Sequence, residues 1–487
     1  MLLLRGWPSL VRRGTANPIG QRPARVQVPA PASSILELKN YPRKLKIPLG
    51  YFFCGTNSCE FSSLFMKNIS TKESFFKFKF NNRSLYCWGA FMKLRMKPED
   101  FIVEEIIDFN KIAGDRCYLY KLTKRNIESL KAFSYIAKKF KIPLKDIGYC
   151  GLKDRHALTT QYISIPKKYG KLSLDEPNLK LELIGESKFL LLGDLEGNRF
   201  TITVRGLKKE DIPKIKENLK YLEFGAPNYF DSQRFGSVFD KKFIAKEVIK
   251  GNYEEAVKIL LTKYKKSEKK LIKDLKRFID KNWGDWDKIW EYIKENNIKS
   301  RLYVNMVKEL KKSNDYKKAL SYVDDRLKKI FVAAYQSYLW NECVKELLRK
   351  YVPEEDRVYY EYECGTLMFY KKMDEEVFNI LKDKKFPTIA PDIEYSGEEK
   401  EIIEEILKRE GLTMEELNNI GELGKFIYSE RKILSIPKNL KIGEFEEDEL
   451  NKGKYKITLS YELEKGSYAT IIIKRAFLGV KTKKRKR

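Results

Sequence analysis

Two kinds of apolar pattern occur along this chain, and together they limit the folds open to it. Residues 179–187 and 200–206 alternate apolar and polar side chains as half-buried strands do, and residues 456–477 are predicted to form two strands joined at Lys465 and Gly466. Residues 207–222 and 241–350 are instead rich in Lys and Glu and place apolar residues at helical spacing. Strands on both sides of a long helical stretch predict an α+β architecture with a helical insertion.

The charge of the chain predicts a polyanionic partner. Lys and Arg number 97 against 68 Asp and Glu, which gives a net charge of +29. Nucleic acid is the first expectation, and an anionic membrane surface or a Lys-rich solvated exterior is the alternative. The single histidine, His156, excludes a His-rich metal centre, so we expect no metal site and a chemistry based on carboxylates, lysines or arginines.

Several other classes of protein lack support in the sequence. No stretch approaches the roughly 18 uninterrupted apolar residues of a membrane span, and the opening MLLLRGW is too short for a secretory signal. Seven irregularly spaced cysteines argue against a disulfide framework and for a reducing compartment. No phosphate loop, dinucleotide fingerprint or CxxC pair is present. We therefore expect a soluble, cytoplasmic protein without membrane association.

The two ends of the chain differ in composition from the rest. Residues 1–36 hold five Arg and no Lys, Asp or Glu, which fits a mitochondrial transit peptide or an extension foreign to the protein. Residues 1–91 as a whole carry 14 basic and 3 acidic groups, and the final KTKKRKR adds +6. We expect residues 1–91 to lie outside the functional fold and residues 480–487 to form a basic tail.

The segment IGYCGLKDRHALTTQYISIP, residues 147–166, holds the densest cluster of unusual residues. A strand is predicted to begin after Gln161, which would leave KDRHALTTQ on a loop, where functional groups are common. Asp154 stands between Lys153 and Arg155, whose charges favour its ionised form if they lie near it, as a nucleophile or general base requires. A solvated charge cluster or a helix cap is the alternative. His156 is a proton shuttle or a hydrogen-bonding support.

Two further segments combine aromatic and polar residues. GAPNYFDSQRFG, residues 225–236, mixes rings with amide and guanidinium groups, which can stack a nucleobase and bond its edge or its phosphates. Core packing is the alternative there, and we expect Phe235 to be a core residue. LRMKPEDFIVEEI, residues 94–106, is explained by a turn into an edge strand.

Six separated segments, in this order, resemble the TruD family of tRNA pseudouridine synthases in its archaeal form. They are KPEDFIVEE (97–105), GLKDRHALTTQ (151–161), GNRFTITVRG (197–206), PNYFDSQRFG (227–236), AYQSYLWNE (334–342) and GSYATIIIKR (466–475). The resemblance covers about residues 92–479 and leaves residues 1–91 as a non-family extension, with the true start near Met92.

The resemblance also implies a domain organisation. A pseudouridine synthase catalytic core, an antiparallel mixed sheet with helices, is expected at residues 92–250 and 431–479. An inserted α/β TRUD domain is expected at residues 251–430, where it would shape recognition of the RNA.

The family's functional residues map onto single positions of this sequence. The nucleophilic aspartate falls on Asp154, and the residues that bind the substrate fall on Phe101, Asn228, Phe230 and Tyr468. Tyr468 is the aromatic residue of the family's GS-[FY]-AT motif; it is Tyr rather than Phe, which should still stack on a base and adds a hydroxyl group.

Supporting positions follow from the same comparison. Arg95 matches a basic position of the family and can form an ion pair with Asp154, and Lys153, Arg155 and His156 are further candidates for an ion pair or support. Asp231 replaces a Gly that is usual in bacterial members. This difference can alter the local backbone, so the resemblance does not fix the position of Phe230.

The activity implied by the resemblance is isomerisation of uridine to pseudouridine, at tRNA position 13, without a cofactor. The aspartate would attack either C1′ of the ribose or C6 of the uracil ring. The alternative is a non-catalytic RNA-binding or assembly protein that uses the same basic, aromatic surface. A carboxylate glycosidase would need two carboxyl groups about 5 to 10 Å apart and gives no reason for the positive charge. The expected partner is tRNA. The sequence does not determine the oligomeric state and is compatible with a monomer.

Overall fold

A ten-stranded mixed sheet forms the larger part of the β structure. The computed structural model describes residues 93–266 and 268–480, so the predicted extension at 1–91 and the last residues of the basic tail, 481–487, lie outside the described residues. The strands run in the order β14-β16-β7-β1-β4-β2-β6-β5, with β15 beside β16 and β3 beside β4. Their bounds are β1 Phe101–Ile107, β2 Cys117–Arg125, β3 Gly148–Tyr149, β4 Leu158–Pro166, β5 Leu174–Glu176, β6 Leu179–Ser187, β7 Leu195–Leu207, β14 Lys438–Ile442, β15 Glu446–Glu447 and β16 Tyr455–Glu464.

The pairing of these strands confirms the predicted α+β class with a mixed sheet. Strands β1 and β4 run parallel, and the other pairs of this sheet are antiparallel. Strand β1 lies between β7 and β4, so the prediction of an edge strand after Pro98 is wrong. The alternation of buried and half-buried residues in β1 reports the two faces of a sheet and carries no information on its neighbours.

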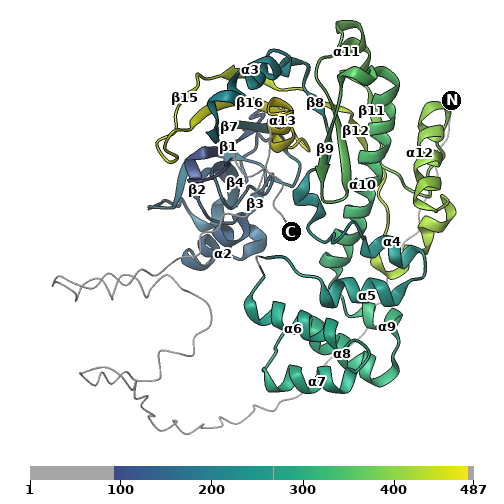
Figure 1. Ribbon diagram of the computed structural model, residues 1–487. Coiled ribbons are helices and arrows are strands. Elements are labelled where there is room, and N and C mark those ends of the chain that lie inside the picture. The colour runs from purple at the N-terminus through teal and green to yellow at the C-terminus, as the bar shows by residue number, and fades with distance from the viewer. Residues whose placement is uncertain (1–92, 267, 481–487) are drawn as a thin grey trace, which may run out of the picture. The chain divides into compact units, whose positions relative to one another are not determined.

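Helices cover the sheet in two separate cores. Helix α2 (Ser129–Lys139) buries Phe133 and Ile136 against apolar residues of β2, β4 and β6. Helix α3 (Ile212–Lys220) and helix α13 (Ala469–Ala476) share a second core with β1, β7 and β16, and Figure 1 shows α13 beside these strands. Strands that alternate apolar and polar residues need such a cover on their apolar face.

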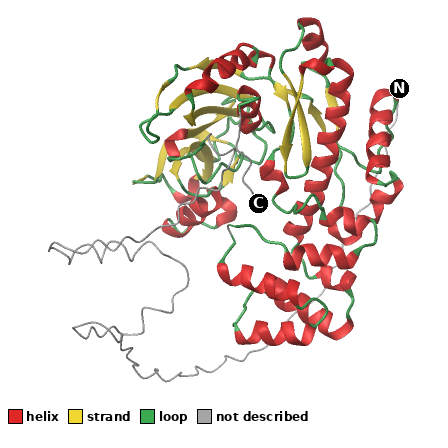
Figure 2. Cartoon of the chain, viewed as in Figure 1, coloured by secondary structure: helices red, strands yellow, loops and turns green. Residues whose placement is uncertain are grey.

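Most of the remaining chain is helical, as predicted for residues 241–350 (Figure 2). The long helix α10 contributes much of the buried surface, with Tyr335 and Trp340 both fully buried. The helices are α4 Ile244–Ile249, α5 Tyr253–Thr262, α6 Lys270–Lys281, α7 Trp286–Glu295, α8 Arg301–Ser313, α9 Tyr316–Ser321, α10 Asp325–Tyr351, α11 Glu375–Leu381 and α12 Gly397–Glu410. Three small sheets join β8 Ala226–Pro227 to β13 Leu434–Ser435, β9 Arg357–Tyr362 to β10 Gly365–Tyr370, and β11 Lys385–Pro387 to β12 Glu430–Lys432.

The second strand predicted within residues 456–477 is wrong. Strand β16 ends at Glu464, a turn follows with Gly466 at φ 86°, and helix α13 begins at Ala469. Ile471, Ile472 and Ile473 are all buried, so this run shows no polar side from which a helix could be read. A short apolar run of β-branched residues fits a buried strand and a buried helix equally well.

The predicted domain boundaries stay a prediction. The strands of the large sheet come from residues 101–207 and 438–464, in agreement with a core built from two separated stretches of the chain. No described helix combines the length and the apolar character needed to cross a membrane.

Candidate active site

The loop that carries Asp154 lies between two strands of the large sheet. Strand β3 ends at Tyr149 and β4 begins at Leu158, so the predicted loop is shorter than expected and Leu158–Gln161 belong to the strand. The reason is tertiary pairing, because Leu158 stands opposite Ile102 of β1 and Arg125 of β2. The loop therefore ends at Ala157, where the chain enters strand β4.

The carboxylate of Asp154 meets two donors from distant parts of the chain. Arg95 Nη2 lies 3.2 Å from Asp154 Oδ2, and the side-chain amide of Gln233 donates to Oδ1 at 3.2 Å. The Asp154 side chain is 30% exposed, whereas that of Arg95 is 5% exposed. The site thus presents a carboxylate that solvent can reach, oriented by one cation and one amide.

Arg95 is itself held by an aromatic ring. Its guanidinium carbon lies 3.8 Å from the centroid of the Phe101 ring, a cation–π arrangement. Phe101 is 1% exposed and packs edge-on against Phe200 at 6.3 Å. The predicted substrate residue Phe101 therefore lies beneath Arg95 in the core.

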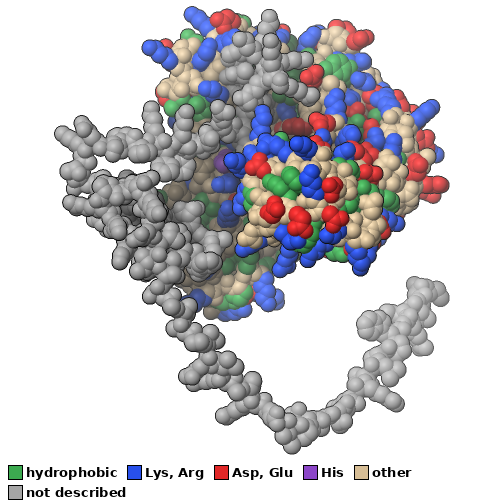
Figure 3. All heavy atoms as spheres, turned by 60° about the horizontal axis from the view of Figure 1, so that its bottom comes forward, with side chains coloured by type: hydrophobic (Ala, Val, Ile, Leu, Met, Phe, Trp, Pro, Cys, Tyr) green, Lys and Arg blue, Asp and Glu red, His purple; other side chains and the backbone are tan. Residues whose placement is uncertain are grey.

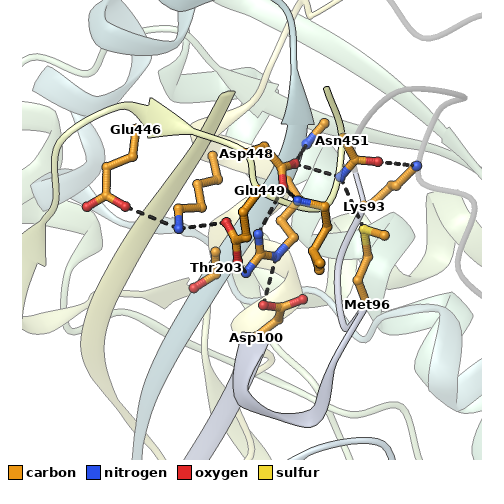
Figure 4. A network of polar contacts seen from close by, with 12 residues as sticks. Lys93, Met96, Asp100, Thr203, Glu446, Asp448, Glu449 and Asn451 are labelled. Carbon is orange, nitrogen blue, oxygen red and sulfur yellow. Dashed lines mark hydrogen bonds and ion pairs between the residues drawn. The ribbon is translucent and has the colours of Figure 1, made fainter. Parts of the chain in front are cut away.

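A buried polar network fixes the segment that carries Arg95. Asp100, Asp448 and Glu449 converge on one guanidinium (Figure 4), that of Arg205, whose contacts to the three carboxylates measure 2.8, 2.9 and 2.9 Å. Lys93 and Arg205 exchange two backbone hydrogen bonds of 2.9 and 3.0 Å. The chain is thus anchored to β7 on both sides of Arg95.

Lys153 does not supply the positive charge that its place beside Asp154 led us to expect. Its ammonium group lies 2.5 Å from Glu105 Oε1, and both side chains are buried. Burial raises the pKa of the Glu105 carboxyl even though Lys153 acts against this. Glu105 was not singled out from the sequence, although a carboxylate at an inward position of an alternating strand is a signal for a buried partner.

Arg155 and His156 lie further along the same loop. Arg155 is exposed and His156 is half-buried. Burial, with the charges of Arg155 and Arg95, holds the pKa of His156 below its ordinary value, and the charge of Asp154 acts in the opposite direction. The imidazole is therefore kept neutral near pH 7.

Phe230 lies in a cage of cations and aromatic rings. Arg431 and Arg234 place their guanidinium carbons 4.0 and 5.1 Å from the Phe230 ring centroid. The Trp340 and Tyr468 rings approach edge-on at 5.5 and 6.2 Å. Phe230 is consequently only 6% exposed.

Arg431 was missed in the sequence, where no local motif marks it. It reaches Phe230 because β13, which follows it in the chain, pairs with β8 and brings this distant part of the chain beside residues 227–236. Its terminal nitrogens donate to the carbonyls of Asn228 and Gly466 at 3.0 and 3.2 Å. Burial lowers the pKa of Arg431 to about 10.

Asn228 is built into the same region by its backbone and its amide. Its backbone N–H donates to the Ile433 carbonyl at 2.7 Å, and its side-chain amide donates to the Lys432 carbonyl at 3.0 Å. The side-chain oxygen Oδ1 is buried and has no hydrogen-bond partner among the described residues. An unpaired buried acceptor is costly and marks this atom for a donor on a ligand.

Asp231 joins the segment that carries Phe230 to helix α13. Its carboxylate accepts hydrogen bonds from the Lys474 ammonium and the Thr470 hydroxyl, and one oxygen also accepts from the Ser232 backbone at 2.7 Å. Its backbone is extended, at φ −102° and ψ 173°, so no glycine-like conformation is needed at this position. Tyr468 stands at the start of the same helix.

A cavity of about 930 Å³ opens beside these groups. Its lining includes Leu152 of the Asp154 loop, Gln233, Arg234 and Tyr468, together with residues of α4, α5, α6 and α10. Figure 3 shows Lys and Arg interleaved with Asp and Glu on the face of the molecule that it presents. Within 93–266 and 268–480, no cluster of three or more His, Cys, Asp or Glu residues is placed to hold a metal ion.

Comparisons with known proteins agree with the geometry. Residues 81–476 match the model of the family described as TruD, tRNA pseudouridine synthase D, a match that begins ahead of Met92. A Methanococcus maripaludis protein named "Probable tRNA pseudouridine synthase D 1" is 57% identical over 387 residues, which cover 79% of this chain and 99% of that protein. The tRNA pseudouridine synthase D of Aquifex aeolicus is 33% identical over 400 residues, which cover 79% and 98%.

A solved structure shows the same similarity in three dimensions. The crystal structure of a TruD protein from Methanosarcina mazei matches with a TM-score of 0.61 and 28% sequence identity. The match covers 80% of this chain and 94% of that chain.

Proposed function

The chain belongs to the TruD family of tRNA pseudouridine synthases, and on this premise we propose that it isomerises uridine to pseudouridine at position 13 of tRNA, with Asp154 as the nucleophile. The observation that carries the proposal is the placement of Asp154 between Arg95 and Gln233 at the edge of a cavity that Gln233 also lines. A carboxylate that is oriented by two donors and open to solvent has what a nucleophile requires.

The reaction needs no group beyond the protein side chains. The N1 glycosidic bond breaks, the uracil turns, and a bond forms between C5 and C1′. The C5 proton is lost and N1 gains a proton, so substrate and product are isomers and no electrons are exchanged. Attack of Asp154 on C1′ and attack on C6 both fit this balance. We therefore propose a reaction that is independent of any cofactor.

The target uridine must leave its stack to reach Asp154, which costs a few kcal/mol. We propose that Phe230 and Tyr468 receive the base, with stacking worth about 1 to 3 kcal/mol. Because only 6% of Phe230 is exposed, the base must displace a guanidinium to reach the face of this ring. The unpaired Oδ1 of Asn228 would accept a hydrogen bond from the RNA, whereas Phe101 would act through Arg95.

The basic surface supplies the remaining affinity for tRNA. The net charge of +29 favours phosphate contacts, which release counterions and make binding weaken steeply with salt. We propose that residues 251–430 shape the recognition of tRNA.

The proposal is tested by mapping pseudouridine in a tRNA transcript after incubation with the purified protein. Chemical labelling of pseudouridine followed by reverse transcription should give a stop at position 13 and none in a transcript with cytidine there. Pseudouridine at another position would refute the assigned site. If the protein binds the tRNA but forms no pseudouridine, the proposed enzymatic activity is refuted and a non-catalytic RNA-binding protein is supported.

A further inference from the structure

Lys124 is buried directly beneath the Asp154 loop. It lies near the end of β2, is 1% exposed, and directs its ammonium group at backbone carbonyls. Its Nζ donates to the carbonyls of Ile127 at 2.8 Å, Lys153 at 3.3 Å and Asp154 at 2.7 Å. An ammonium group has three hydrogens, so each of them has one acceptor here. Two of the three acceptors belong to the loop that carries Asp154.

The placement of this lysine is not explained by an ion pair. No carboxylate within the described part of the chain lies within salt-bridge distance of Lys124, and burying an ion without such a partner is unfavourable. Lys121 on the same strand is half-buried on the opposite face, as strand alternation requires. An apolar residue at position 124 would avoid the desolvation cost, so the charge must serve the carbonyls it contacts.

Other side chains hold the same loop from the same side. The Lys153 backbone N–H donates to the Ser129 hydroxyl at 3.0 Å, and that hydroxyl donates to Gln161 Oε1 at 2.8 Å. Gln161 in turn donates to the Gly151 carbonyl at 3.3 Å. The backbone from residue 151 to residue 154 is thus held by polar groups of β2, α2 and β4, and Lys124 alone among them contacts Asp154 itself.

We propose that Lys124 is a positioning residue that, as the ammonium ion, holds the backbone of Asp154 so that its carboxylate faces the substrate. This inference rests on the proposed function of Asp154 as the nucleophile. A neutral amine has two hydrogens and a lone pair, so one of the three carbonyls would face a lone pair and the loop would shift.

The ionisation of Lys124 occurs within an accessible pH range. Burial, together with the charge of Lys153, lowers the pKa of Lys124 from the ordinary 10.5 to about 8. The charges of Asp154 and Glu128 act in the opposite direction. The turnover number kcat should therefore fall as the pH rises through about 8.

The free energy of unfolding should change with pH in the direction opposite to kcat. Between the lowered pKa of the folded state and the ordinary value of the unfolded state, the unfolded chain binds more protons than the folded one. The contribution of Lys124 to the free energy of unfolding therefore rises with pH in this range. Loss of activity together with undiminished stability is a combination that a purely structural lysine would not give.

The experiment compares kcat at saturating tRNA from about pH 6.5 to about pH 9.5 for the wild type, Lys124→Met, Lys124→Arg and the control Lys121→Met. The wild type and Lys121→Met should lose up to about tenfold in kcat between about pH 8 and about pH 9.5, levelling off near the rate of Lys124→Met. Lys124→Met should be about tenfold slower at neutral pH, with KM little changed, and should lack the alkaline decline. Lys124→Arg should keep its kcat to the highest pH because a guanidinium stays protonated.

An alkaline decline that Lys124→Met keeps would overturn the inference, as would a flat wild-type profile with pseudouridine still forming. If the variants do not fold, the wild type alone tests the inference. Its kcat must fall as the pH rises through about 8, while its free energy of unfolding stays constant or rises. No pseudouridine at any pH would overturn the proposed function, and this inference with it.

Discussion

Nη2 of Arg95 lies 3.2 Å from Oδ2 of Asp154, across 59 positions of sequence. The contact depends on a segment that is fixed on both sides, by the backbone pairing of Lys93 with Arg205 and by the bond from Arg205 to Asp100. The orientation of the proposed nucleophile therefore depends on contacts with β7.

Replacing Arg95 with Met should lower kcat by about tenfold to a hundredfold, because the Asp154 carboxylate loses the cation that orients it; each tenfold step is about 1.4 kcal/mol of barrier. Arg95→Lys should recover part of the rate. Arg199→Met is the matched control, since Arg199 forms an exposed ion pair with Glu462 on the same sheet. Equal rates for Arg95→Met and Arg199→Met would contradict the role of Arg95.

Replacing Asp231 with Ala should destabilise the protein by about 3 to 5 kcal/mol, because the buried Lys474 ammonium loses its carboxylate. The double variant Asp231→Ala, Lys474→Met should recover a large part of this loss. Urea denaturation measures both values. A double variant no more stable than the single one would show that the pair does not set the cost.

Acid should weaken the fold through Asp448. Burial would raise the pKa of this carboxyl, but hydrogen bonds from Asn451, Gly206, Leu450 and Arg205 hold it below its ordinary 3.8. A carboxyl with a lowered pKa in the folded state stabilises the fold above its ordinary pKa, and this contribution is lost as the pH falls through the folded-state value.

Asp448→Asn should therefore be less stable than the wild type near neutral pH, with a difference that shrinks below about pH 4. Free energies of unfolding in urea, measured across this range, give the comparison. A difference that stays constant down to the lowest pH would rule out Asp448 as the titrating group.

A protein that begins at Met92 should keep its pseudouridine synthase activity. Lys93 pairs with Arg205, so this start retains the first described contact with the sheet. Activity assays and solubility of the shortened protein check the expectation. An insoluble product would instead show that residues 81–91, which the family model also matches, are needed for folding.

Much of this site could be predicted from the sequence because its motifs are local. The order of six short segments identified the family, and the resemblance made Arg95 a candidate partner of Asp154, a pairing that the structure contains. The ion pair of Lys153 with Glu105 instead of Asp154 could not be predicted, because Glu105 lies on a distant strand, β1. Arg431 and Lys124 could not be identified for the same reason. The position of Arg431 depends on the pairing of β13 with β8, and that of Lys124 on the Asp154 loop folding back onto β2.

The secondary structure, too, was predicted correctly only where the sequence pattern carried enough information. Periodicity identified the helices of residues 241–350 and the strands β6 and β7, which have a polar side. It failed for α13, whose residues 471–473 are buried all round. Patterns of polarity report contact with water, so they lose their information where an element has none.

The central claim is that Asp154 is the nucleophile. Asp154→Asn keeps the size of the side chain and removes its charge, so it should form no detectable pseudouridine at position 13 while binding tRNA nearly as tightly as the wild type. The measurement is pseudouridine formed over time under single-turnover conditions, with tRNA binding measured on the same preparations. Pseudouridine formation by Asp154→Asn at the wild-type rate would contradict the account.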